Sequence, residues 1–213
     1  PRIVRSAADP TQILRVTVGQ SNAAANNVEA IDLKVRYQFN LGDIGLDDWG
    51  SMTIQGAATK LDVWEYRKFV TDEMSSPLGK RNRFLGEAPP LPELKANLML
   101  TWVNGNHSAT FNTRYIDEVE YDGYSWGSDF FDQFPYFTGF DTDIRDTLRP
   151  STISDVAYNY RGMEIAGTDV DLTFGARNVF DRLPQRVNDF AGMESILYDG
   201  RGRLIYGRIT IEF

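Results

Sequence analysis

The side chains that could do chemistry in this chain are loop aromatics and strand charges rather than a catalytic set. His107 is the only histidine, and neither a serine–aspartate constellation nor a zinc-ligand spacing accompanies it. The chain has no cysteine, which excludes disulfides, thiolate metal sites and cysteine nucleophiles. No glycine-rich phosphate loop lies between a predicted strand and a helix. The sequence therefore predicts no enzyme, no bound cofactor and no metal site.

The densest group of candidate ligand-binding residues is a run of aromatic side chains in the segment 121–150. Aromatic walls with a few polar groups are typical of small-molecule sites, and such rings can stack on a siderophore, a sugar or a cobalamin-like ligand. The alternative is that the rings pack the loop onto itself and onto the rim of the sheet. The candidates are Tyr121, Tyr124, Trp126, Phe130, Phe131, Tyr136 and Phe137.

Two sets of charged residues also suggest binding. Asp141, Asp143 and Asp146 could hold a hard cation such as calcium, but the glycine and terminal glutamate of an EF-hand loop are absent, which favours solvated loop acids. A second set lies on predicted strands. It could steer an anionic metal chelate, or it could pair with Asp32, Asp169 and Asp171 and line a wet interior. The residues of this lumen-facing set are Lys34, Arg36, Asn112, Arg114 and Arg177.

These residues are positioned by strands in which apolar and polar side chains alternate. The clearest strand runs from Val28 to Phe39, and the last residues alternate in the same way up to the terminal Phe213. Asn104-Gly105-Asn106 predicts a tight hairpin turn, and a change of parity between Ala58 and Leu61 predicts a bulge. About eight strands are predicted in all, at 12–19, 28–39, 51–69, 92–102, 107–120, 152–160, 168–178 and after residue 200.

Long and short connections alternate along the chain. The segments 70–91, 121–150 and 181–200 are long, whereas 104–106 and 161–167 are short. Outer-membrane barrels have short periplasmic turns and long extracellular loops, and their strands of about 9–11 residues cross the bilayer at a tilt. No run approaches the ~18 consecutive apolar residues of a membrane helix. The pattern predicts an all-β fold, a segment of an antiparallel up-and-down transmembrane β-barrel.

One stretch carries a specific family resemblance. Residues 175–184, Gly-Ala-Arg-Asn-Val-Phe-Asp-Arg-Leu-Pro, resemble the penultimate-strand signature of TonB-dependent outer-membrane receptors, with valine where that family usually has leucine. Residues 198–203 resemble the family's approach to its last strand, and 28–33 carry a weaker similarity. The motif residues are Asn178, Val179, Phe180, Asp181 and Pro184. In the last strand, Ile209, Ile211 and Phe213 resemble the pattern that outer-membrane assembly machinery recognises.

Physical chemistry explains the motif without a transport role. Asn178 and Asp181 can bond the backbone and close a turn, Phe180 can sit in an interfacial aromatic girdle, and Pro184 ends the ladder because it lacks a donor. The motif then identifies a family and touches no substrate.

The resemblance implies a fold, a location and partners. Such receptors are barrels of about 22 strands with a plugged lumen, so this chain would supply about eight strands of wall and the external loops. The plug domain and the TonB box would lie outside it. The implied function is TonB-energised uptake of siderophore-bound iron, cobalamin or carbohydrate across a Gram-negative outer membrane. The implied partners are lipid, TonB through the plug, the barrel assembly machinery and a small-molecule substrate.

Two alternative folds stay open, whereas a nucleic-acid partner is not expected. A complete eight-stranded barrel would have a side-chain-filled interior and would pair its first strand with its last. A soluble carbohydrate-binding β-sandwich would need two sheets whose apolar faces oppose each other. The net charge of −8 argues against a nucleic-acid partner.

Overall fold

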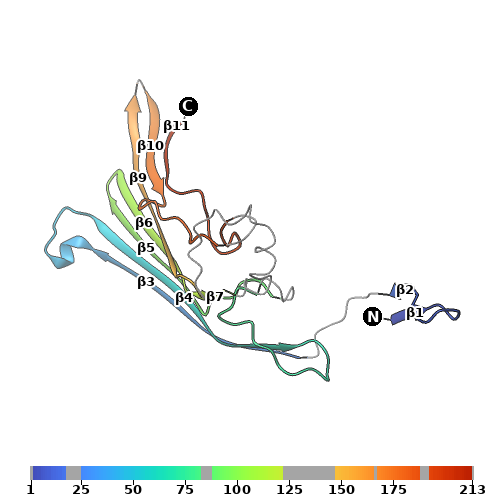
Figure 1. Ribbon diagram of the computed structural model, residues 1–213. Coiled ribbons are helices and arrows are strands. Elements are labelled where there is room, and N and C mark those ends of the chain that lie inside the picture. Colours follow the sequence, from blue (N-terminus) through green and yellow to red (C-terminus); the bar gives the residue numbers. More distant parts are fainter. Residues whose placement is uncertain are drawn as a thin grey trace.

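The protein is built from β-strands, and seven of the strands in its described part form one antiparallel sheet (Figure 1). The computed structural model describes residues 2–17, 25–82, 88–121, 147–165, 167–187 and 192–212. In spatial order the sheet is β11-β10-β9-β6-β5-β4-β3, so each strand pairs with the next sheet strand along the chain. The all-β, antiparallel, up-and-down arrangement is confirmed. The strands are β3 (Ala25–Asn40), β4 (Ser51–Arg67), β5 (Leu94–Asn104), β6 (His107–Ile116), β9 (Ser151–Ile165), β10 (Thr168–Arg177) and β11 (Leu204–Glu212).

This sheet is open at both edges. Among the described residues β3 pairs only with β4 and β11 only with β10, and no ladder joins β3 to β11. The pairing of first with last strand that a complete small barrel requires is therefore not present in this sheet. Within the described residues, no helix is long and apolar enough to cross a membrane.

Two short strand pairs lie outside the sheet. β1 (Arg2–Arg5) and β2 (Ile13–Thr17) form a separate antiparallel hairpin, and β7 (Val119–Glu120) pairs with β8 (Thr147–Leu148). The strand predicted at 12–19 therefore belongs to its own hairpin and not to the sheet, and its partner β1 was not predicted.

Period-2 alternation divides the sheet into an apolar and a polar face. One row of directly opposed residues crosses all seven strands on the apolar face: Phe39, Met52, Trp102, Ala109, Tyr158, Phe174 and Gly207. On the polar face, hydrogen bonds link neighbouring strands through side chains. Asn97 donates to Asn112 at 2.8 Å, and Thr173 donates to Asn159, also at 2.8 Å. Such cross-strand pairs stabilise the register.

The alternation of connection lengths is confirmed. The connections after β3, β5 and β9 are short, and that after β3 contains the 3-10 helix η1 (Leu41–Ile44). The connections 68–93, 117–150 and 178–203 are long and follow the opposite ends of the strands. The turn predicted at 161–167 is shorter than expected because β9 continues to Ile165. Gly162, with φ of 70°, lies beside a shift in register where Val170 opposes Met163 and Leu172 opposes Tyr160, so this glycine marks a bulge.

The bulge predicted in β4 lies slightly further along the strand. Glu29 opposes Val63 while Ala30 opposes Leu61, which leaves Asp62 as the extra residue. The parity change in the sequence is therefore confirmed as an irregularity of this strand.

The long connections meet in a small hydrophobic cluster, called here the loop cluster. It comprises Val119, Tyr121, Leu148, Val187 and Tyr198. A buried ion pair between Arg81 and Glu194 lies in the same region, and the Arg81 guanidinium lies 4.9 Å from the centre of the Tyr121 ring. Figure 1 shows the described parts of these connections gathered on one side of the sheet.

Candidate ligand-binding cleft

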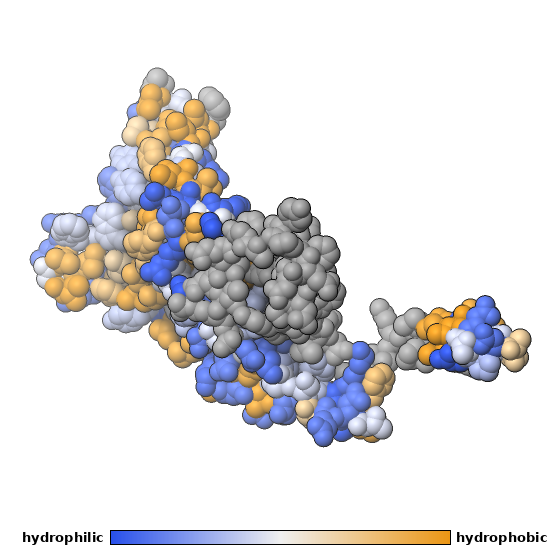
Figure 2. Space-filling model, in the orientation of Figure 1, coloured by the Kyte–Doolittle hydropathy of each residue, from blue (hydrophilic) through white to orange (hydrophobic). Residues whose placement is uncertain are grey.

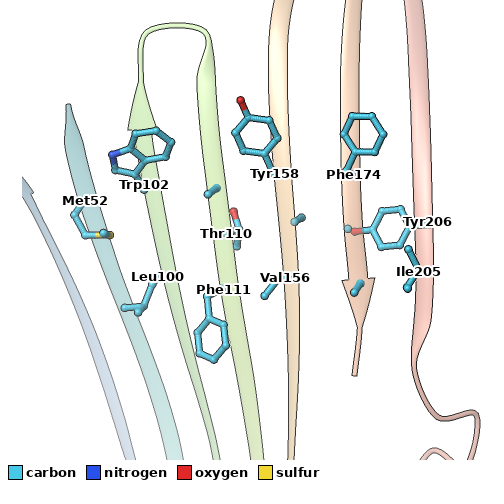
Figure 3. Close-up of a pocket in the computed structure, with 14 residues that line it drawn as sticks. Met52, Leu100, Trp102, Thr110, Phe111, Val156, Tyr158, Phe174, Ile205 and Tyr206 are labelled. Carbon is cyan, nitrogen blue, oxygen red and sulfur yellow. The ribbon is translucent and has the colours of Figure 1, made fainter. Parts of the chain in front are cut away.

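The apolar face of the sheet is largely exposed. On β11 the side chains of Ile205 and Ile209 are 75% and 68% exposed. Figure 2 shows apolar surface gathered over the ends of the sheet near its short turns. Near the middle of the sheet lies a shallow apolar hollow of about 640 Å³ (Figure 3). It is lined by residues of β4, β5, β6, β9, β10 and β11, among them Trp102, Phe111 and Phe174. The lining contains no Asp, Glu, Lys, Arg or His and is dominated by apolar side chains, so the hollow is suited to hydrocarbon contact.

A polar hollow of about 700 Å³ lies on the opposite face, between the sheet and the connection 178–203. Strands β6, β9 and β10 contribute Asn112, Arg114, Asp155 and Arg177. The returning connection contributes Tyr198, Asp199, Arg201 and Arg203. We call this hollow the arginine cleft, after Arg114, Arg177, Arg201 and Arg203.

The cleft exists because the chain reverses sharply after β10. Asn178 and Asp181 have φ of 49° and 54°, in the left-handed region that asparagine and aspartate tolerate. The Asn178 amide closes the turn on both sides, donating to the Arg182 carbonyl at 2.7 Å and accepting from the Arg182 N–H at 2.9 Å. Asp181 Oδ1 accepts from the Arg203 N–H at 2.8 Å. The motif residues therefore fold the connection back and fix the arginines at the start of β11.

Both acids of the cleft accept hydrogen bonds through both of their oxygens. Asp155 Oδ2 forms an ion pair with Arg114 at 3.1 Å, and its Oδ1 accepts from the Asn178 N–H at 2.9 Å. Both oxygens of Asp199 accept from Arg201, with the shortest contact at 2.6 Å. These hydrogen bonds lower the pKa of the Asp199 carboxyl to about 2, so it remains ionised at neutral pH.

The other two arginines have no such partner. Arg177 and Arg203 are exposed and form no ion pair with a carboxylate of the described residues. The guanidinium of Arg203 donates to the Val179 carbonyl at 3.5 Å. Four arginines against two aspartates leave the lining with a charge of +2, in a chain whose net charge is −8.

A second hollow of about 540 Å³ adjoins the cleft and shares Ser151, Pro184 and Tyr198 with it. Its lining includes Arg182 and Arg186 and contains no acidic residue. Tyr198 forms the shared wall from the loop cluster, where its hydroxyl donates to the Arg149 carbonyl at 3.2 Å. Burial, followed by the charges of Glu194 and Asp117, raises the pKa of Tyr198 to about 12.

The structure brings together three of the five predicted lumen-facing residues. Asn112, Arg114 and Arg177 line the cleft, whereas Lys34 and Arg36 lie on the edge strand β3. Arg114 forms its ion pair with Asp155, an aspartate that the sequence did not single out, and not with Asp32, Asp169 or Asp171. Asp32 instead accepts from the Thr59 hydroxyl, and Asp171 accepts from the Gly162 N–H.

Sequence reasoning missed Tyr198, Asp199, Arg201 and Arg203 as cleft residues. The signal that could have found them is the pair of arginines around Gly202, directly before the last strand. Gly202 has φ of 68°, and a Cβ at this position would lie 3.1 Å from the Asp181 carboxylate. This close approach brings both arginines to the cleft.

Most of the aromatic ligand-binding set lies outside the described residues. Tyr121 is described, and it packs in the loop cluster with 9% of its surface exposed. This position corresponds to the alternative in which the aromatic rings pack the loop rather than bind a ligand. On the last strand, Ile209 and Ile211 lie on the exposed apolar face. The predictions that fall outside the described residues concern Tyr124, Trp126, Phe130, Phe131, Tyr136, Phe137, Asp141, Asp143, Asp146 and Phe213.

Comparisons with protein-family models, with curated proteins and with solved structures find no match for this chain. Among the described residues, no group of three or more histidine, aspartate or glutamate side chains is placed to hold a metal ion. The arginine cleft is therefore the best-defined candidate site in the described part of the chain.

Proposed function

We propose that this chain forms part of the wall and external loops of a TonB-dependent outer-membrane receptor that takes up a small molecule. The observation that carries the proposal is the uncovered apolar face, which runs across seven strands opposite a polar, hydrogen-bonded face. A soluble sandwich needs a second sheet over such a face. The described residues contain no sheet packed there. Lipid is the environment that stabilises an exposed apolar band.

Aromatic side chains near the short turns support a membrane interface. Trp102, Tyr158 and Phe174 lie in one row of the apolar face. The Trp102 indole donates to the Trp49 carbonyl at 2.6 Å, which ties this row to the turn after β3. Rings with an apolar body and a polar handle gather at the boundaries of membrane barrels. The 11 residues of β5 also match the length that crosses a bilayer at a tilt.

The arrangement of the loops supports a receptor role. All three long connections lie at one end of the sheet, and the arginine cleft lies at that end on the polar face. In the proposed receptor this end faces outward and the polar face lines the lumen, so a ligand caught by the loops would meet the cleft on its way inward. The resemblance at 175–184 is the further support for energised uptake.

Cysteine labelling tests the proposal directly, because the chain has no cysteine of its own. Ile209 and Thr210 are neighbours on β11 and belong to opposite faces. An environment-sensitive fluorophore on Ile209→Cys should be quenched by spin-labelled lipid in outer-membrane vesicles, and the same fluorophore on Thr210→Cys should not. Equal quenching of both, or recovery of the protein in the aqueous phase without detergent, would contradict the membrane assignment.

A further inference from the structure

We infer that the arginine cleft binds a small organic polyanion, whose carboxylate or phosphate groups are held by Arg177 and Arg203. The inference names the substrate class of the proposed receptor and in that respect rests on the proposed function. The binding site itself follows from the charge and geometry of the cleft.

The two aspartates that line the cleft do not balance the charge of its four arginines. Asp155 uses one oxygen for Arg114 and the other for the Asn178 N–H, and Asp199 uses both oxygens for Arg201. Each of these carboxylate oxygens already accepts a hydrogen bond, and neither acid forms an ion pair with Arg177 or Arg203. The guanidinium groups of Arg177 and Arg203 therefore line the hollow as cations that form no ion pair with the described residues.

Carboxylates and phosphates are the groups that suit these two guanidinium cations. A guanidinium presents a planar fork of donors that matches a carboxylate or a phosphate, and hydrogen bonds between opposite charges are the strong ones. Asn112 lines the same wall and can donate to an anion through its amide. A neutral sugar would leave both arginines without a counter-charge.

The size of the cleft and of the adjoining hollow bears on how many anionic groups the ligand carries. The cleft has a volume of about 700 Å³ and continues past Tyr198 into the hollow of about 540 Å³, where Arg182 and Arg186 lie without an acid in the lining. Each volume is in the range of ordinary small-molecule sites. Positive side chains on both sides of Tyr198 favour a ligand with at least two separated anionic groups.

Titration calorimetry on the purified protein tests the inference with three probes. Citrate supplies carboxylates, tripolyphosphate supplies phosphates, and maltotriose is the neutral control. We expect one of the two polyanions to bind at low salt, more weakly at high salt because exposed charges are screened, and maltotriose not to bind. The difference between citrate and tripolyphosphate identifies the source of the anionic group.

Three variant proteins locate the site. Arg177→Gln with Arg203→Gln should weaken binding by about tenfold or more for each arginine removed. Lys34→Gln with Arg36→Gln removes the same charge from the polar face of β3 and should leave the affinity within about twofold, since exposed charges this remote from the cleft are largely screened. Asp199→Asn frees Arg201 and should tighten binding. This last variant gives the opposite sign, so that loss of folding cannot imitate it.

Two results would overturn the inference. One is that neither polyanion binds the unaltered protein at millimolar concentration. The other is that the cleft variant and the β3 variant lose affinity equally, which would mean general electrostatic attraction. Fluorophore quenching on Ile209→Cys is independent of these titrations, so failure of the inference and failure of the membrane assignment are distinguishable.

Discussion

The contact between Arg81 and Glu194 holds two of the long connections together. The two side chains are 1% and 5% exposed. Arg81 also lies over the ring of Tyr121, which belongs to the remaining long connection, 117–150. Removing one partner of a buried ion pair leaves an uncompensated charge, which costs far more than breaking an exposed pair. The order of the loop cluster, and with it the Tyr198 wall of the cleft, therefore depends on this pair.

We expect Glu194→Gln to destabilise the loop cluster by about 3 kcal/mol or more, because the buried Arg81 guanidinium loses the carboxylate of its ion pair. Hydrogen exchange of the amides in 77–82 and 192–198 measures this as faster exchange. The matched control is Lys60→Gln, which breaks the exposed Lys60–Asp62 pair at 2.8 Å and should change exchange little. Unchanged exchange in Glu194→Gln would mean that the loops are held in place by other contacts.

Of the cleft arginines, the sequence predicted only those that lie on strands. Alternation places Arg114 and Arg177 on the polar face because successive strand residues point to opposite sides. Arg201 and Arg203 reach the same cleft through the turn at Asn178 and the long connection that follows it. The alternation within strands does not relate Arg201 and Arg203 to the residues of β6. Their position depends instead on tertiary contacts such as the hydrogen bond from the Arg203 N–H to Asp181.

Strands were more predictable than their ends and irregularities. The segments predicted at 28–39, 51–69 and 168–178 correspond to β3, β4 and β10, since alternation over ten or more residues is a strong signal. The end of β9 was predicted too early because Gly162 suggested a turn. The structure uses it in a bulge, where a glycine with positive φ is equally suitable.

One glycine of β10 is required by its neighbour on β11. Gly175 is directly opposite Tyr206, and a Cβ at Gly175 would lie 2.5 Å from Tyr206 Cζ. We expect Gly175→Ala to cost about 1 kcal/mol of unfolding free energy, because the Tyr206 ring must swing off the strand. Denaturant unfolding followed by tryptophan fluorescence measures this cost.

The control for this prediction is another strand glycine with open space around it. A Cβ at Gly56 on β4 would meet nothing within 4 Å, so Gly56→Ala should be neutral or slightly stabilising. In a Tyr206→Ala background, Gly175→Ala should lose its cost, because the ring that it displaces is gone. A cost that persists in this background would show that the glycine is needed for the backbone itself.

Among the described residues, the seven-stranded sheet has two long unpaired edges. β3 offers 16 residues of backbone on its free side, and β11 offers nine. Free strand edges readily pair with further strands, and a membrane cannot hydrogen-bond them. Alternation predicts the face on which each side chain lies, but it does not predict how many strands a sheet contains.

Disulfide trapping distinguishes a sheet closed by β3 and β11 from a larger barrel. Under the proposed function further strands lie between these edges, so cysteine pairs Val35→Cys with Ile205→Cys or with Ile209→Cys should not cross-link in outer-membrane vesicles. The positive control is Leu98→Cys with Thr113→Cys, residues directly opposed on β5 and β6. That pair should cross-link because neighbouring strands bring Cα atoms within the 4.4–6.8 Å span of a disulfide. An intramolecular β3–β11 cross-link with the same yield as the control would identify a small closed barrel. Such a barrel has a side-chain-filled interior and leaves no path for a substrate, so uptake through this wall would be excluded.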